Sequence, residues 1–298
     1  MKEKQTLIQN LAFMALMAAI NMVFSLVALF IPLASLFLMI ALPMASVMVV
    51  LVCKEKYYPI YALATLCLSF LATFNGPETT LFYLLPSLLS GFLFGFLIKR
   101  RIYSGWIILA VSALELAMSY MTMLLINVIY ETDMVAFFAR MFVMDQSPYI
   151  GVIMPTFFFV LALAQSAFCF IVIQSETKKF GFQVKTEVSN PKLLPWSAFA
   201  TLPLMVLGAF VAPWLSYLML PCFIFFSILS FILVWPKRTQ KLNIIWSISE
   251  FLTLFLFAAV FDWVQAPLSL LFIGLFFLPS DVLCLLSFYF KTNTKTIK

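Results

Sequence analysis

Long apolar segments separated by short polar ones are the dominant pattern of this sequence. The first apolar run covers residues 7–31, has no charged side chain, and contains Gln9, Asn10 and Asn21 as its strongly polar residues. A hydrocarbon layer about 30 Å thick needs about 20 apolar residues in helical conformation. The run therefore predicts a membrane-spanning helix that can cross the bilayer with some tilt.

Further apolar segments follow, each ended by charged residues, proline or a turn sequence. Asn-Gly and Gly-Pro steps at residues 75–77, for example, predict a turn between two segments. Because a helix satisfies its own backbone hydrogen bonds in lipid, we expect an all-α polytopic membrane protein with about ten transmembrane helices. The segments after the first are residues 33–52, 57–74, 81–98, 106–130, 150–173, 193–211, 215–235, 244–261 and 268–289.

A polar connector separates the first six predicted helices from the last four. It follows the sixth helix and is rich in lysine and other polar residues. We expect residues 1–175 to form a six-helix membrane domain and residues 176–192 to form a cytoplasmic connector. Residues 193–298 would then be a four-helix membrane extension that ends in a basic tail.

Composition and charge support a membrane location. Of the 298 residues, 64% are hydrophobic and 10% are charged, whereas soluble domains have about 45–50% and about 25%. With the N-terminus in the cytoplasm, every one of the 18 basic residues except Arg140 lies on the cytoplasmic side, as positive charges in membrane proteins do. We therefore expect both termini in the cytoplasm. This asymmetry and attraction to anionic lipid explain the net charge of +6 without a nucleic-acid partner.

The sequence contains no pattern typical of a catalytic or metal site. It has no histidine, and its five cysteines lie within or at the ends of apolar segments, at spacings that do not match metal sites. Histidine is the most common metal ligand and general base in proteins. We therefore expect no metal or other cofactor, and we do not expect an enzyme.

Three acidic residues, Glu115, Glu250 and Asp281, lie inside predicted membrane helices. A carboxylate there costs at least about 2.5–3.5 kcal/mol on insertion scales, so such residues usually face the interior of a helix bundle. Ser112 and Ser119 lie on the same helical stripe as Glu115. Two interpretations remain open: neutral carboxyl groups hydrogen-bonded between helices, or sites that bind a proton or cation.

Small residues recur at helical spacing in two of the predicted helices. Ala12, Ala15 and Ala19 form a stripe on the first helix, and Gly91 and Gly95 form a GxxxG pattern in the fourth. Such residues allow two helix backbones to approach closely. We interpret the GxxxG pattern as a packing contact. The alanine stripe is either a contact surface or the ordinary alanine content of a membrane helix.

The predicted outer segment at residues 131–149 is unusual for a connector. Its centre, residues 134–144, is too short to span a membrane and too apolar for a solvated loop. It therefore either lies in the membrane interface or folds over an outward-facing cavity. Over a cavity, Arg140 would donate hydrogen bonds to an anionic or carbonyl group of a ligand; in the interface, it would meet lipid phosphate or Asp133 and Asp145.

Three N-terminal segments are similar to a known family. They are ALMAAINMVFSLVALFIP, MIALPMASVMVVLVCKEKYYPIYALATLCLSFLATFNGPE and GFLFGFLIKRR. In these segments the chain resembles the substrate-binding S components of energy-coupling factor (ECF) transporters. Its length, with helices beyond the sixth, is more similar to the YybS-like predicted bacterial membrane proteins, which are related to S components. The resemblance implies a protein of the bacterial cytoplasmic membrane that binds or takes up a small vitamin- or nutrient-like molecule.

The resemblance also implies positions for the ligand and the partner. S components receive substrate from the outer face, under the loops that follow the first, third and fifth helices. They contact the scaffold subunit of an energy-coupling module, which also contains ATPases, through small residues of the first helix; here these are Ala15 and Ala19. The implied substrate-binding residues are Asn75, Glu78, Glu115, Asn127 and Arg140.

Two other functions remain open on the sequence alone. In an ion- or proton-coupled secondary transporter, Glu115, Glu250 or Asp281 would bind the coupling ion. A non-transport accessory subunit of a membrane complex would need none of these residues for coupling. Co-purifying ATPases would favour the S-component function, whereas activity of the lone protein that a protonophore abolishes would favour ion coupling.

Overall fold

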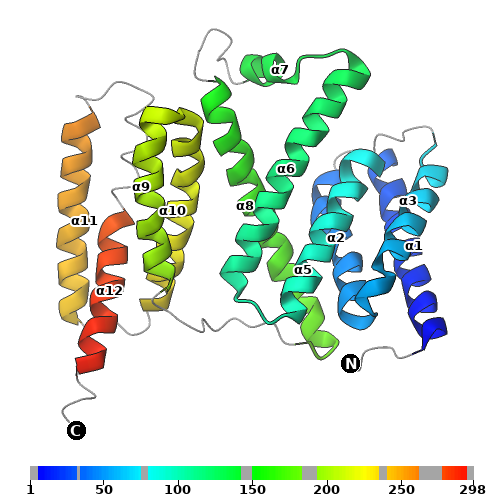
Figure 1. Cartoon of the computed structure of the whole chain (residues 1–298), viewed down its shortest axis with the longest axis horizontal. Helices are drawn as coiled ribbons and strands as arrows, with labels where there is room; N and C mark the ends of the chain where they lie inside the picture. Colours follow the sequence, from blue (N-terminus) through cyan, green and yellow to red (C-terminus); the bar gives the residue numbers. More distant parts are fainter. Residues whose placement is uncertain are drawn as a thin grey trace. The chain divides into compact units, whose positions relative to one another are not determined.

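The computed structural model describes residues 6–31, 34–74, 80–141, 150–182, 193–234, 240–261 and 277–293 (Figure 1). Within these ranges all regular elements are helical and no strand occurs, which confirms the all-α prediction. The chain divides into two compact units. Unit 1 is Met1–Thr132 with Leu161–Val188, and unit 2 is Asp133–Val160 with Ser189–Lys298.

Unit 1 is built from helices that are consecutive in the sequence, followed by the second part of a long helix, α8. Its 3-10 element η1 and π element η2 each precede a longer helix. The elements are α1 (Leu7–Phe30), α2 (Ala34–Val52), η1 (Glu55–Tyr57), α3 (Tyr58–Ala72), η2 (Thr80–Leu84), α5 (Leu85–Lys99), α6 (Ser104–Tyr130) and α8 (Ile150–Lys179) from Leu161 onwards.

Local capping explains where α1 begins. The Thr6 hydroxyl accepts a hydrogen bond of 3.3 Å from the Gln9 N–H, as a side chain at a helix N-cap does. Asn10 is buried one turn later, and its Oδ1 accepts a 3.1 Å hydrogen bond from the Lys54 N–H. Asn10 thereby ties α1 to the turn between α2 and α3.

Helices α2 and α5 pack closely because α5 has glycine, without a side chain, at two positions that face α2. A β-carbon on Gly91 would lie 2.5 Å from the Pro43 carbonyl oxygen, and one on Gly95 would lie 2.6 Å from Val50 Cβ. Both distances are shorter than van der Waals contact allows, so only glycine fits. This confirms the interpretation of the GxxxG pattern as a packing contact.

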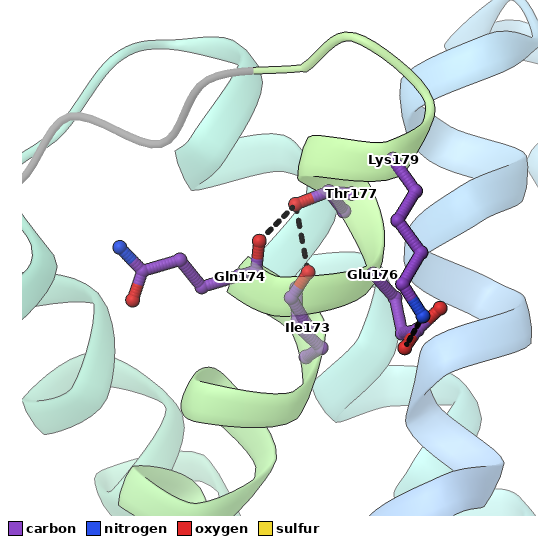
Figure 2. A network of polar contacts seen from close by, with 5 residues as sticks. All are labelled: Ile173, Gln174, Glu176, Thr177 and Lys179. Atoms are coloured by element: carbon purple, nitrogen blue, oxygen red, sulfur yellow. Dashed lines mark hydrogen bonds and ion pairs between the residues drawn. The ribbon is translucent and has the colours of Figure 1, made fainter.

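Helix α8 is longer than the sixth predicted segment, which was expected to end at residue 173. Figure 2 shows its polar end: Thr177 Oγ1 donates a 2.7 Å hydrogen bond to the Ile173 carbonyl oxygen, and Lys179 pairs with Glu176 at 2.5 Å. The helix stops before Gly181, whose φ of 81° suits glycine. Because polar residues continue a helix beyond the apolar run, hydropathy alone placed the end too early.

Unit 2 contains the short helix α7, the first part of α8 and four further helices (Figure 1). Its tightest contact is the hairpin between α9 and α10, where a β-carbon on Gly208 would lie 2.8 Å from the Ser216 nitrogen. The Ser216 hydroxyl also donates a 2.5 Å hydrogen bond to the Met205 carbonyl oxygen. The helices are α7 (Met134–Met141), α9 (Leu193–Val211), α10 (Pro213–Val234), α11 (Gln240–Phe261) and α12 (Leu278–Asn293).

Helix length and composition make the chain a membrane protein. Each of the ten expected segments contains a helix, although ten spans and the cytoplasmic position of both termini remain predictions. The expected domain bounds are also still a prediction, and residues 183–192 of the expected connector lie outside the described residues. In the described part, the helices long and apolar enough to span a bilayer are Leu7–Phe30, Phe82–Lys99, Ser104–Tyr130, Ile153–Lys179 and Pro213–Ile232.

Candidate functional site

A buried polar contact joins α1 to α3 in unit 1. Asn21 has 0% of its surface exposed, and its Nδ2 donates a 3.0 Å hydrogen bond to the Tyr61 hydroxyl. Asn21 Oδ1 has no partner in the part of the chain that the structure describes. A buried amide oxygen without a partner can accept a hydrogen bond from a bound water or from a donor group of a ligand.

Tyr58 extends this polar interior to α5. Its hydroxyl donates a 2.6 Å hydrogen bond to the Leu88 carbonyl oxygen, and its ring centroid lies 5.5 Å from that of Tyr61. The two tyrosines are one turn apart on α3, so one helix supplies polar groups to both α1 and α5. Hydroxyl and amide groups therefore occupy the interior of an otherwise apolar bundle.

Glu115 faces the interior of unit 1, as its place on a polar stripe predicted. It is 7% exposed, and its Oε2 accepts a 2.9 Å hydrogen bond from the Ser166 hydroxyl of α8. Its Oε1 has no partner among the described residues. Ser112, one turn earlier on α6, lies 3.4 Å from the Ala162 carbonyl oxygen, so the same face of α6 makes a second polar contact with α8.

The other predicted substrate-binding residues are not brought together in the described part of the chain. Asn75 and Glu78 lie outside the described residues. Asn127 is half-buried on α6 but is separated from Glu115 by 12 residues of helix, or about 18 Å along the axis. The two residues therefore lie at different depths along α6 and do not contact each other at the base of a common ligand site.

Arg140 lies on α7 in unit 2 and is exposed. Its Nε donates a weak 3.4 Å hydrogen bond to the Ala136 carbonyl oxygen of its own helix. Asp133 caps the start of the same helix, where its Oδ1 accepts a 3.1 Å hydrogen bond from the Ala136 N–H. The short helix fits both expectations for this segment, an interfacial helix and a cover over a cavity.

The alanine stripe of α1 lies on the surface of unit 1. Ala15 and Ala19 are exposed, whereas Ala18 is 2% exposed and Asn21 is fully buried. Helix α1 therefore has a polar inner face and a small-residue outer face. The outer face is accessible to lipid or to another membrane helix.

In unit 2, the other two acids that lie in predicted membrane helices contact serines on neighbouring helices. Asp281 of α12 is fully buried, with its Oδ2 2.5 Å from the Ser227 hydroxyl of α10. Glu250 of α11 is half-buried, and its Oε1 accepts a 3.2 Å hydrogen bond from the Ser280 hydroxyl of α12. Carboxyl groups bound between helices are one of the two interpretations left open by the sequence.

Sequence reasoning missed the serines that bind these acids. Ser166 and Ser227 lie 51 and 54 residues from Glu115 and Asp281, so no local spacing relates the members of each pair. The one feature of the sequence that could have pointed to these serines is a hydroxyl residue inside an apolar segment. Because many such serines only bind their own helix backbone, this signal does not identify the pairs.

The described side chains contain no group of three or more His, Cys, Asp or Glu residues that could hold a metal ion. Comparison with known proteins adds no identification: no family model, curated protein or solved structure matches this chain.

Proposed function

We propose that this chain is a protein of the bacterial cytoplasmic membrane that binds or takes up a small vitamin- or nutrient-like molecule, in the manner of an S component of ECF transporters. The observation that carries the proposal is the two-sided character of α1. Its inner face places the amide of Asn21, with one oxygen available, inside the bundle, and its outer face presents Ala15 and Ala19.

Each face of α1 suits one requirement of such a protein. A small-molecule site is mostly apolar with a few polar groups that orient the ligand, which describes the surroundings of Asn21 and Tyr61. A stripe of small exposed residues allows the close approach of a helix from a scaffold subunit. The proposed partners are therefore the lipid bilayer, the small molecule and an energy-coupling module of scaffold subunit and ATPases.

The test replaces the outer stripe and measures partner binding. In the double variant Ala15→Trp with Ala19→Trp, bulk on the stripe should prevent association, reducing ATPases that co-purify with the tagged chain at least about tenfold. Leu63→Trp with Leu71→Trp is the matched control, because both residues are exposed on α3 of the same unit and should tolerate tryptophan. Equal recovery of ATPases with the stripe variant and the control would refute the proposed contact.

A second candidate, an ion- or proton-coupled secondary transporter, is favoured by Glu115. A buried acid with a hydroxyl partner and one unpartnered oxygen is a typical ion-coupling group in membrane helices. Under this function, the protein alone in liposomes should move solute only with an ion gradient. Glu115→Gln should abolish that movement, and a protonophore should do the same for a proton gradient.

A further inference from the structure

The contact between Asp281 of α12 and Ser227 of α10 raises the question of which residue supplies the proton of the hydrogen bond between them. Asp281 is fully buried, its Oδ2 lies 2.5 Å from Ser227 Oγ, and its Oδ1 has no partner in the described part of the chain. The Ser227 hydroxyl therefore makes its contact with a carboxyl group that has no access to solvent. Either the serine or the acid supplies the proton of this short hydrogen bond.

The serine already uses its proton elsewhere. Ser227 Oγ lies 2.9 Å from the carbonyl oxygen of Phe223, four residues earlier on the same helix, and a carbonyl can only accept. Ser230, one turn later, makes the same 2.9 Å contact with the Phe226 carbonyl oxygen. A hydroxyl carries one proton, so neither serine can donate to Asp281 while it donates to its own helix.

Two of the helices that pack against α12, α9 (Leu193–Val211) and α10 (Pro213–Val234), carry no basic residue that could pair with an ionised Asp281. Helix α9 has no titratable side chain, and α10 has only a tyrosine and a cysteine. On α11, Glu250 binds Ser280, and the only basic residue precedes Glu250 by nine positions. On α12 itself, the nearest titratable group is the Cys284 thiol, one turn along the helix, and the basic residue lies ten positions after Asp281. The tyrosine and cysteine of α10 are Tyr217 and Cys222, the basic residue of α11 is Lys241, and that of α12 is Lys291.

We propose that Asp281 and Ser227 form a proton-binding site in the membrane-embedded part of unit 2. The proton is on Asp281 Oδ2 and is donated to Ser227 Oγ, and the Ser227 proton is donated to the Phe223 carbonyl oxygen. Every proton then has one acceptor, and no uncompensated charge is buried. Release of the proton leaves a carboxylate that needs water or a cation, so it requires α10 and α12 to separate. This inference concerns unit 2 and does not rest on the function proposed for unit 1.

Infrared spectroscopy of the full chain in lipid nanodiscs measures the protonation state directly. Compared with the wild type, Asp281→Asn should lack one carboxylic acid C=O band. In the wild type this band should shift in D₂O, because the acid proton exchanges. The asparagine amide can still donate to Ser227, so the variant should fold. Loss of carboxylate stretching bands in place of the acid band would overturn the proposal.

A second variant tests the same site with Asp281 intact. In Ser227→Ala the acid loses its acceptor, so its C=O band should move relative to the wild type. Ser249→Ala is the matched control, because Ser249 donates to the Trp246 carbonyl oxygen of its own helix α11 and should leave the band in place. An acid band that does not move in Ser227→Ala would show that Asp281 does not donate to Ser227, which contradicts the proposal.

Discussion

In the described part of each unit, a buried acid contacts a serine on another helix, but the two contacts differ in their hydrogen bonding. In unit 1, the only described hydrogen bond of the Ser166 hydroxyl is the one to Glu115. In unit 2, the Ser227 hydroxyl contacts both Asp281 and the Phe223 carbonyl oxygen. Both acids have one oxygen without a partner among the described residues.

This difference decides which protonation states each contact allows. Ser166 can donate to Glu115 as a carboxylate or accept from it as an acid, because its one proton is not committed to a backbone carbonyl. Ser227 can only accept from Asp281 while it donates to Phe223. A carboxylic acid and a serine therefore make a contact that tolerates ionisation in unit 1 and one that excludes it in unit 2.

The largest expected effect is on stability when the serine of unit 2 is removed. Ser227→Ala leaves the acid proton of Asp281 buried without an acceptor, which should lower the free energy of unfolding by about 1–3 kcal/mol at every pH below that of proton release. Ser166→Ala is the comparison, and its cost should depend on pH because Glu115 can change its protonation state. Denaturant unfolding of both variants in detergent measures this. An equal pH dependence in both variants would remove the distinction between the units.

Native cysteines beside the two acids report on opening of each contact. Cys284 lies one turn after Asp281 on α12, and Cys169 lies near Glu115; both are fully buried. At alkaline pH the α10–α12 contact should open, so that a small thiol reagent labels Cys284 about tenfold faster in the wild type than in Asp281→Asn, equivalent to about 1.4 kcal/mol. Both proteins are labelled at the same pH, so the intrinsic reactivity of the thiol cancels in the ratio of their labelling rates.

Cys169 is the internal control for that experiment, because its rate should be the same in the wild type and in Glu115→Gln. If alkaline pH accelerated labelling of both cysteines equally, general loosening of the protein would explain the result better than proton release from Asp281.

A smaller effect is expected when each acid is replaced by its amide. Asp281→Asn keeps a donor toward Ser227, so its free energy of unfolding at neutral pH should stay within about 0.5 kcal/mol of the wild type. Glu115→Gln keeps an acceptor for Ser166 and should behave similarly at low pH. A loss of several kcal/mol in Asp281→Asn would mean that the acid is ionised in the folded protein.

The smallest effect is expected for the ion pair at the end of α8. Glu176 pairs with Lys179 in contact with solvent (Figure 2), and the exposed fraction of the lysine side chain is 67%. Lys179→Ala should therefore lower the free energy of unfolding by no more than about 0.5 kcal/mol, and less at high salt. A larger loss would show that the helix end is held more tightly than an exposed ion pair allows.

Hydropathy determined much of the architecture in advance. The length of an apolar run and the residues that end it are local properties, so the start of α1 at Leu7 and both bounds of α9 agree with the predicted segments. The glycines of α5 also disclosed a close helix contact, because the absence of a side chain is itself a local signal. Local signals fail where a helix continues into polar sequence, as α8 does.

Only the tertiary structure decided which groups these helices bring together. Nothing in the sequence relates Glu115 to Ser166, Asp281 to Ser227, or Asn21 to Tyr61, since each pair joins helices that are distant along the chain. The proton available at Asp281 likewise depends on Ser227, which donates to the Phe223 carbonyl oxygen of its own helix and meets Asp281 only when α10 and α12 pack. An acidic residue in an apolar segment can be identified from composition, but its protonation state depends on the donors and acceptors that folding places around it.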